Sequence, residues 1–275
     1  MRPIQLNFSI ITFLLATVSC AQKEPHSESL PSAVSPVHIL REEAQVAYGG
    51  AHETWRLEWT AKPKEACAIK SEDSQTCPCS EFSYAEYGPA DLARIRDGRE
   101  IQRFHLAPLF NGADLAQDET DAVFQHWPAE EADFSATPPA PETIRNRPPV
   151  KIMNIADYNH DGWSSEFVLQ VGAGPCGHRS AVLLGVTKAG KNHVLHAFGT
   201  VKSPHTPLVL APAAWRLLRE SKRIRYVSLQ CGDHAADEQE EITLQIVANG
   251  IRAFQETFAC RDDLKKGKFI RRVEL

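Results

Sequence analysis

The sequence predicts a mainly β protein in which antiparallel sheets and hairpins form two packed lobes, with one short helix. Two dipeptides, Asp97-Gly98 and Asn249-Gly250, each separate runs of apolar residues, which is typical of two-residue hairpin turns. Residues 54–59 alternate polar and large apolar side chains, so one face of this strand should be buried. Hydrophobic residues make up 43% of the 275-residue chain, enough for a sizeable core.

The N-terminus has the features of an export signal. Residues 10–18 form an apolar run that is too short to span a bilayer. The run ends in Thr17-Val18-Ser19-Cys20, which resembles the lipobox of bacterial lipoproteins. The resemblance implies that residues 1–20 are a signal peptide and that Cys20 carries lipid, so the membrane is a partner through this anchor. It also implies a periplasmic or outer-membrane-anchored protein in a bacterium. Ordinary cleavage after Ala21 is the alternative.

Changes in composition divide the rest of the chain. Residues 21–40 are rich in Ser, Pro, Glu and His and should form a disordered tether. Residues 41–127 are expected to be one β-rich lobe. Residues 128–149 form a Pro-rich linker, and residues 150–275 should form a second β-rich lobe that contains a calcium-type loop.

The second lobe contains the clearest hairpins and the helix. Residues 181–186 and 193–198 flank a turn at Ala189-Gly190, and Asn249-Gly250 joins two further strands. A helix is expected over residues 212–221, because a proline begins it and its large apolar residues recur at helical spacing. In the first lobe, Trp55 and Trp59 share a strand face. We expect both in the core rather than stacked on a sugar.

Residues 157–166, with the sequence Asp-Tyr-Asn-His-Asp-Gly-Trp-Ser-Ser-Glu, place oxygen-bearing side chains at alternate positions before a glycine. Ca²⁺ takes six to eight oxygen ligands, and glycine lets the backbone turn tightly around it. The stretch resembles the calcium loops of EF-hands and of FG-GAP-type β-repeats. The resemblance implies one structural Ca²⁺, with ligands from Asp157, Asn159, Asp161, Trp163 through its carbonyl and Ser165. Glu166 stands one place after the position where the FG-GAP-type loop has its acid, and it is the expected further ligand.

The flanks of the loop favour strands over helices. Val150–Ile155 before the loop and Phe167–Val171 after it are short, apolar and partly β-branched. We therefore expect a strand, the loop and a second strand, with the two strands paired. A polar hairpin turn without an ion is the alternative.

Lipidation of Cys20 leaves six of the seven cysteines. An even number in an exported chain indicates disulfides, because that compartment is oxidising. Each predicted lobe holds three, so three bridges would include at least one between the lobes. The expected bridging residues are Cys67, Cys77, Cys79, Cys176, Cys231 and Cys260. A Cys₂His₂ metal set from Cys176, His178, Cys231 and His234 is the alternative.

The sequence names no ligand. The net charge of −5 gives no basic surface for nucleic acid, and no known catalytic motif is present. The hypothesis that fits these sequence features best is an exported, lipid-anchored, non-catalytic β-rich protein. It would have one structural calcium loop and an unidentified protein or glycan partner. The alternative is an exported hydrolase that uses acidic residues on a glycan or a phosphate ester.

The export signal yields the first testable prediction. If lipid is attached to Cys20, the Cys20→Ala variant should be released in soluble form or remain unprocessed, because the attachment atom is lost. Membrane fractionation and intact mass of the wild-type protein measure this. An unmodified N-terminus at Gln22 would contradict lipidation and leave export standing.

Overall fold

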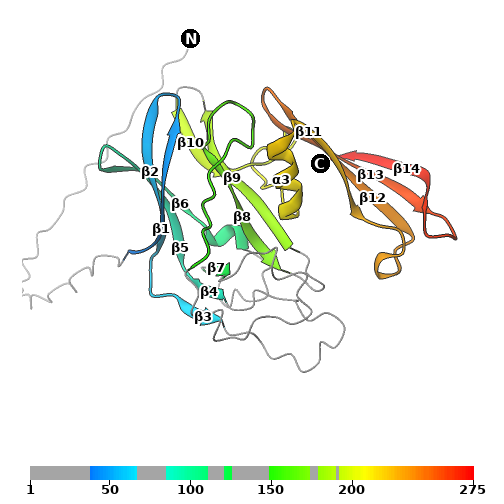
Figure 1. Ribbon diagram of the computed structural model, residues 1–275, viewed down its shortest axis with the longest axis horizontal. Helices are drawn as coiled ribbons and strands as arrows, with labels where there is room; N and C mark the ends of the chain where they lie inside the picture. Colours follow the sequence, from blue (N-terminus) through cyan, green and yellow to red (C-terminus); the bar gives the residue numbers. More distant parts are fainter. Residues whose placement is uncertain (1–37, 67–84, 111–120, 126–148, 174–178, 190–191) are drawn as a thin grey trace, which may run out of the picture. The chain divides into compact units, whose positions relative to one another are not determined.

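A computed structural model describes residues 38–66, 85–110, 121–125, 149–173, 179–189 and 192–275. Residues Pro36–Leu275 form one compact unit, distinct from Met1–Ser35. The described part is mainly β with several antiparallel sheets and one α-helix, as the sequence predicts (Figure 1). The predicted signal peptide with Cys20, most of the predicted tether and linker, and Cys67, Cys77, Cys79 and Cys176 lie outside the described residues.

The first four-stranded sheet confirms the pattern of alternating residues near the N-terminus. Its strands are, in order across the sheet, β1 (Ile39–Tyr48), β2 (Ala51–Trp59), β5 (Ala90–Arg96) and β6 (Arg99–His105). Trp55 and Trp59 are both buried in the core, as expected. The turn between β5 and β6 is Asp97-Gly98, and both residues have positive φ angles, 50° and 73°. That geometry is the one favoured in two-residue hairpins.

Three further sheets complete the β structure. Two are three-stranded and one is four-stranded. One three-stranded sheet consists of β3 (Lys64–Ala66), β4 (Ala85–Gly88) and β7 (Ala122–Gln125). The other has the order β10 (Asn192–Ala197), β9 (Arg179–Ala189) and β8 (Glu166–Ala173). The four-stranded C-terminal sheet has the order β11 (Arg223–Leu229), β12 (Glu238–Val247), β13 (Gly250–Cys260) and β14 (Lys266–Glu274).

Short helical segments connect the sheets. The α-helix α3 spans Pro212–Glu220, close to the predicted residues 212–221, and begins with its proline. Two 3₁₀ turns are η1 (Ala107–Phe110) and η3 (Asp233–Ala235). Among the described residues, no helix has the length and apolar character needed to cross a membrane.

The strand β9 separates two hydrophobic cores. Its side chains alternate, so that Val182, Leu184 and Val186 enter the first core whereas Ala181 and Leu183 enter the second. The first core also contains side chains of the first sheet, and the second contains those of α3 and the C-terminal sheet. The first core therefore combines residues from both predicted lobes. The lobe boundaries themselves stay a prediction, because most of residues 128–149 lies outside the described part.

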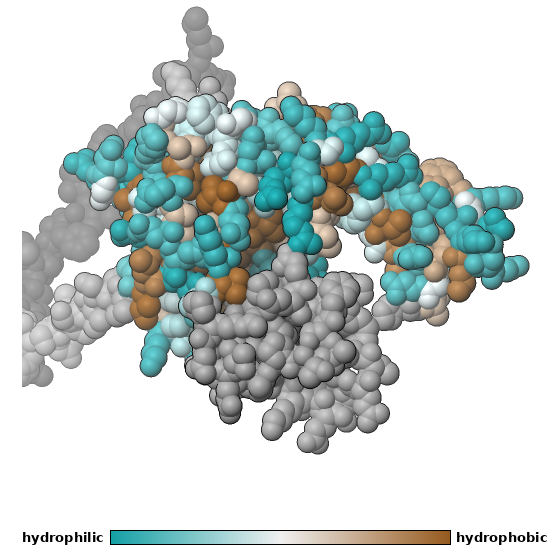
Figure 2. Space-filling model, in the orientation of Figure 1, coloured by the Kyte–Doolittle hydropathy of each residue, from teal (hydrophilic) through white to brown (hydrophobic). Residues whose placement is uncertain are grey.

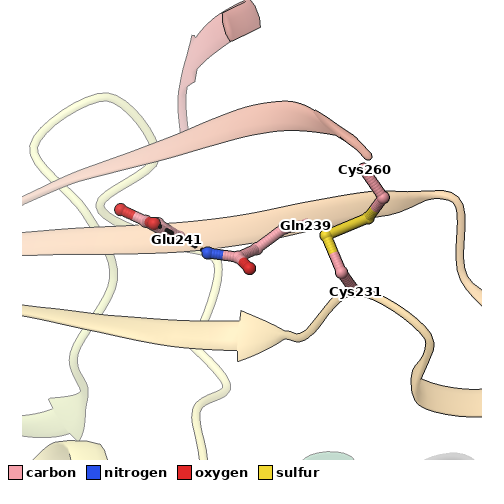
Figure 3. The surroundings of a disulfide bond; sticks show 4 residues. All are labelled: Cys231, Gln239, Glu241 and Cys260. Carbon is pink, nitrogen blue, oxygen red and sulfur yellow. Dashed lines mark hydrogen bonds between the residues drawn. A yellow bond between two sulfur atoms is a disulfide. The ribbon is translucent and has the colours of Figure 1, made fainter. Parts of the chain in front are cut away.

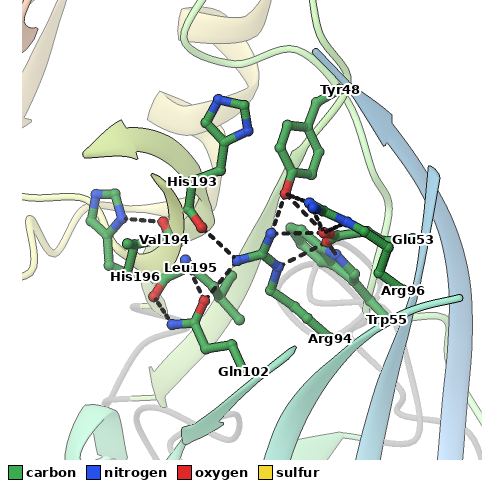
Figure 4. Close-up of polar contacts among 10 residues, drawn as sticks. All are labelled: Tyr48, Glu53, Trp55, Arg94, Arg96, Gln102, His193, Val194, Leu195 and His196. Carbon is green, nitrogen blue, oxygen red and sulfur yellow. Dashed lines mark hydrogen bonds and ion pairs between the residues drawn. The ribbon is translucent and has the colours of Figure 1, made fainter. Parts of the chain in front are cut away.

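A buried polar network joins the first sheet to β10 (Figure 4). Arg94 is 1% exposed and donates two hydrogen bonds to the Glu53 carboxylate, at 2.8 and 2.9 Å. Gln102 pairs with the backbone of Leu195 in both directions, each bond being 2.9 Å long. Its amide thus acts as a neighbouring strand would, and the free edges of β6 and β10 become linked.

Cys231 and Cys260 form a disulfide with Cα atoms 5.6 Å apart (Figure 3). Both belong to the predicted second lobe, so this bridge does not join the two lobes. The alternative Cys₂His₂ set would need a free thiolate on Cys231, and the disulfide removes it. The remaining predicted bridges involve residues outside the described part.

The strand predicted before the loop of residues 157–166, here called the acidic loop, is absent. This corrects the expectation for residues 150–155. The amides of Ile152 and Met153 instead donate to the Glu42 carboxylate at 2.6 and 2.8 Å. The next two amides, of Asn154 and Ile155, bond carbonyls only two residues back. A carboxylate and tight turns therefore take the amides that a strand partner would have used.

The outer strand β14 carries exposed apolar and basic residues together. Phe269, Ile270 and Val273 are between 44% and 56% exposed. Figure 2 shows hydrophilic and hydrophobic side chains interspersed over the part formed by β12–β14. Such charges on an edge strand oppose pairing with another chain, and the irregular register between β13 and β14 adds to this effect.

The Gln102 link can be tested by mutation. The Gln102→Ala variant should lower the free energy of unfolding by about 1–3 kcal/mol, because partly buried backbone groups of Leu195 lose their partners. Gln45→Ala is the matched control, since Gln45 bonds the exposed Thr54 on the same sheet. It should cost less than about 0.5 kcal/mol. Urea denaturation measures both, and equal losses would contradict the proposed link.

Candidate functional site

The predicted calcium residues lie in a loop that leads directly into β8. The backbones of Ala156 and Glu166 close its base, with N–H···O distances of 2.8 and 3.2 Å. Two residues in the loop have positive φ, His160 at 55° and Gly162 at 93°. Glycine adopts such angles at little cost, which explains its position after Asp161.

The side chains at alternate loop positions turn inward and bind the loop's own backbone. Asp157 Oδ2 accepts the Gly162 amide at 3.0 Å, and Asn159 Oδ1 accepts the Asp161 amide at 2.9 Å. Asp161 Oδ1 accepts the Trp163 amide at 2.9 Å. The loop is therefore preorganised by three side chains that the sequence marked as ligands.

Glu166 brings a fully buried carboxylate to this loop, with 0% exposure. Its Oε1 accepts the Ser165 hydroxyl at 2.7 Å and Asn159 Nδ2 at 3.0 Å. Its Oε2 accepts the Tyr158 amide at 3.0 Å. The first residue of β8 is thus tied to the loop by three hydrogen bonds from neutral donors.

Gly185 makes room for this carboxylate. It stands opposite Glu166 in the register of β8 and β9. A Cβ atom at Gly185 would lie 2.5 Å from Glu166 Cγ and 2.8 Å from the Ser165 carbonyl oxygen. Because no real contact is that short, a side chain at this position would displace Glu166. The opposing strand contributes to the site, and the loop sequence alone does not reveal it.

The electrostatics of Glu166 are unfavourable for a charged carboxylate. Burial, together with the nearby Asp161 and Asp157, raises the pKa of Glu166 to about 8, although hydrogen bonds from Ser165 and Tyr158 act in the opposite direction. Asp157 adds a second unfavourable feature, since its Oδ1 is buried without a hydrogen-bond partner. Three acidic side chains thus gather where negative charge is poorly compensated.

The donor types at this loop fit a hard cation, but the atoms do not yet surround one point. Among the described residues, no group of three or more His, Cys, Asp and Glu side chains is arranged to hold a metal ion. Asn159 Nδ2 lies between two of the acids, 3.1 Å from Asp161 Oδ2 and 3.0 Å from Glu166 Oε1. Rotation of this amide would turn its oxygen toward the acids, but Asn159 would lose the hydrogen bond that its Oδ1 accepts from the Asp161 amide. A cage therefore requires the acids and this amide to rearrange together.

Two of the predicted ligands are engaged in other contacts. The Trp163 carbonyl accepts the Ser165 amide at 3.1 Å, in a turn that leads into β8. The Ser165 hydroxyl points to Glu166. The structure thus brings together Asp157, Asn159, Asp161, Ser165 and Glu166, while Trp163 belongs to the exit of the loop.

A second acidic cluster, which the sequence analysis missed, lies on the outer face of the first sheet. Glu58 and Asp91 are paired neighbours on β2 and β5, and Arg103 contacts both, at 3.1 and 3.3 Å. His105 Nδ1 lies 2.7 Å from Asp91 Oδ1. These residues come from three strands, so only their register reveals the cluster. One guanidinium serves both carboxylates, whereas acid–base hydrolysis needs carboxylates in different environments.

Comparisons of the chain with protein-family models, with curated proteins and with solved structures find no match. The geometry of the acidic loop is therefore the basis on which a function can be proposed.

The buried Glu166 predicts an unusual pH dependence in calcium-free buffer. The folded state keeps the Glu166 proton up to about pH 8, whereas the same carboxyl in the unfolded chain, with its ordinary pKa of 4.5, releases it at a much lower pH. The folded state thus binds more protons between these values, so the free energy of unfolding should fall as pH rises. The loss should be on the order of a few kcal/mol, since one pKa unit corresponds to about 1.4 kcal/mol.

Chemical denaturation in a chelator between pH 5 and pH 8 measures this loss. The Glu166→Gln variant is the control, because its amide keeps the shape and has no proton to release. The difference between the two proteins isolates the contribution of Glu166 from those of all other titratable groups. Parallel pH profiles would contradict the burial argument.

Proposed function

We propose that this chain is an exported, lipid-anchored, non-catalytic β-rich protein whose acidic loop binds one structural Ca²⁺. Asp157, Asn159, Asp161 and Glu166 would supply side-chain oxygens, with Ser165 and the Trp163 carbonyl beside them. The single observation that carries the calcium proposal is the environment of Glu166. It is a fully buried glutamate held by neutral donors and flanked by two other acids.

The other buried glutamates of the described part differ from Glu166 in that each has a positively charged partner. Glu53 is held by Arg94 at 2.8 Å and Glu58 by Arg103 at 3.1 Å, and Glu241 has Arg225 and Lys266 at 2.6 Å. At Glu53, burial would raise the pKa, but hydrogen bonds from Arg94, Trp55 and Tyr48 bring it below its usual value. Burying a carboxylate is costly unless a positive charge accompanies it. A divalent cation would give Glu166 what its counterparts obtain from arginine and lysine.

The choice of calcium follows from the donor set. Carboxylate, amide and hydroxyl oxygens are hard ligands, which favour Ca²⁺ over the softer transition metals. Mg²⁺ requires a near-ideal octahedron, and an adaptable loop serves Ca²⁺ better. The affinity should be weak, with a dissociation constant on the order of 10⁻⁴–10⁻³ M, as for extracellular modules.

The alternative, an exported hydrolase acting on a glycan or a phosphate ester, receives less support from the same residues. Glu166 has a raised pKa beside two other acids, which could suggest a general acid. Its side chain is fully buried, however, and a general acid must reach the substrate. The same carboxylate is better placed to hold an ion within the loop.

Calcium binding can be measured directly on the full chain. Titration with CaCl₂ should release or absorb heat in the millimolar range, and free calcium at ten times the dissociation constant should stabilise the fold by about 1.4 kcal/mol. Asp157→Asn should abolish both effects, because it removes one charge while an amide oxygen can still accept the Gly162 amide. MgCl₂ should bind more weakly.

Asp262→Asn is the matched control, since Asp262 is an exposed acid in the turn after β13. It should bind calcium like the wild-type protein. If the wild-type protein shows neither heat nor a melting shift at millimolar calcium, the loop is a polar turn and the calcium proposal fails.

A further inference from the structure

Alternate side chains of the acidic loop point in opposite directions, and those that point outward contact α3 or its core. Asp157, Asn159 and Asp161 turn toward the interior of the loop. The residues between them, Tyr158 and His160, point away and contact the helix or its core. The loop therefore offers ligands on one side and anchors on the other.

His160 binds the end of α3. Its Nε2 lies 2.7 Å from the Leu218 carbonyl oxygen in the last turn of the helix. The final carbonyls of a helix have no partner within the helix, and the Ser221 amide already serves the Leu217 carbonyl. His160 thus supplies a donor that this helix end needs. The left-handed backbone of His160, with φ of 55°, is what directs the ring there.

Tyr158 connects a proposed ligand to the second core. Its amide donates to Glu166 Oε2 at 3.0 Å, while its side chain is only 4% exposed among core residues that include Trp215 and Leu218. Arg219 of the helix lies near the Tyr158 side chain. A shift of the Glu166 carboxylate would therefore be transmitted to the core through one residue.

The helix is the link between this loop and the C-terminal sheet. Trp215 Nε1 donates to the Ala181 carbonyl of β9 at 2.9 Å, which fixes α3 on the central strand. The face of α3 that includes Trp215 and Leu218 shares the second core with Leu244 and Ile251 of the C-terminal sheet. Loosening α3 would expose part of this core and leave the first core intact.

We propose that Ca²⁺ bound by the loop controls how firmly α3 is docked, with Tyr158 and His160 as positioning residues that couple the ion to the helix. This inference rests on the proposed calcium binding. The ion holds the inner side chains of the loop in place, and Tyr158 and His160 on the outer side therefore keep their contacts with α3 and its core. Without the ion the loop opens more often, and α3 is released locally while the first core stays folded.

Hydrogen–deuterium exchange of the full chain, in CaCl₂ and in EGTA, tests the coupling. At free calcium ten times the dissociation constant, the amides of α3 should exchange roughly tenfold more slowly than in EGTA. In EGTA the amides of α3 should exchange faster than the most protected amides of β2, because α3 opens locally whereas the β2 amides of the first core wait for global unfolding. Equal protection of α3 and β2 in EGTA, or no slowing in α3 while calorimetry shows calcium binding, would overturn the inference.

A variant of His160 separates coupling between the ion and α3 from a general loss of fold stability. His160→Asn keeps a residue that tolerates the left-handed backbone but is too short to reach Leu218. It should still bind calcium, and calcium should slow exchange in α3 less than in the wild-type protein, because only Tyr158 still couples the loop to the helix. Slowing equal to that of the wild-type protein would overturn the role of His160.

Coupling must also act in the reverse direction. Trp215→Phe removes the hydrogen bond to Ala181 and should weaken calcium binding by about fivefold, although Trp215 is no ligand. Trp59→Phe damages the first core instead and should change calcium affinity by less than about twofold. Equal affinities in the two variants would overturn the coupling. Absence of calcium binding by the wild-type protein would instead remove the proposed function itself.

Discussion

The burial of β9 on both faces is the constraint on which the rest of the structure depends. A strand with apolar side chains in both directions must be covered twice, because each exposed face would cost hydrophobic free energy. Val182 and Leu184 are covered by the first core, and Ala181 and Leu183 by the second. The first sheet and α3 therefore cover the two faces of one three-stranded sheet, the C-terminal sheet packs next to α3, and the acidic loop leads into β8.

Among the described residues, the buried glutamates other than Glu166 are each paired with an arginine or a lysine. The Glu53–Arg94 pair shows how an ion pair is accommodated in a core, with both of its side chains almost fully buried and held by several hydrogen bonds. Glu166 is buried to the same degree, and its neighbours are acids and neutral donors. An unfavourable group of this kind is more often found at functional sites than in structural cores. For this reason the loop, and not the larger network of Figure 4, carries the proposed function.

Local sequence signals predicted much of the fold because they act over a few residues. Three such predictions are confirmed: the buried face with Trp55 and Trp59, the two-residue turn at Asp97-Gly98, and the proline at the start of α3. The spacing of Asp157, Asn159 and Asp161 likewise identified side chains that lie together in the loop. Export, lipidation and ion binding stay predictions, since the described structure does not test them.

Local sequence thus specified several strands and hairpins, the helix and the inner residues of the loop, because hydrophobic periodicity and turn chemistry are local. The tertiary structure alone decided what fills each strand edge and each buried position. Residues 150–155 had a strand-like composition, but Glu42 took their amides. Gly185 became part of the loop site only through strand register, and Cys231 met Cys260 across a separation of 29 residues. These pairings depend on which distant groups satisfy buried polar atoms, and local sequence does not encode that choice.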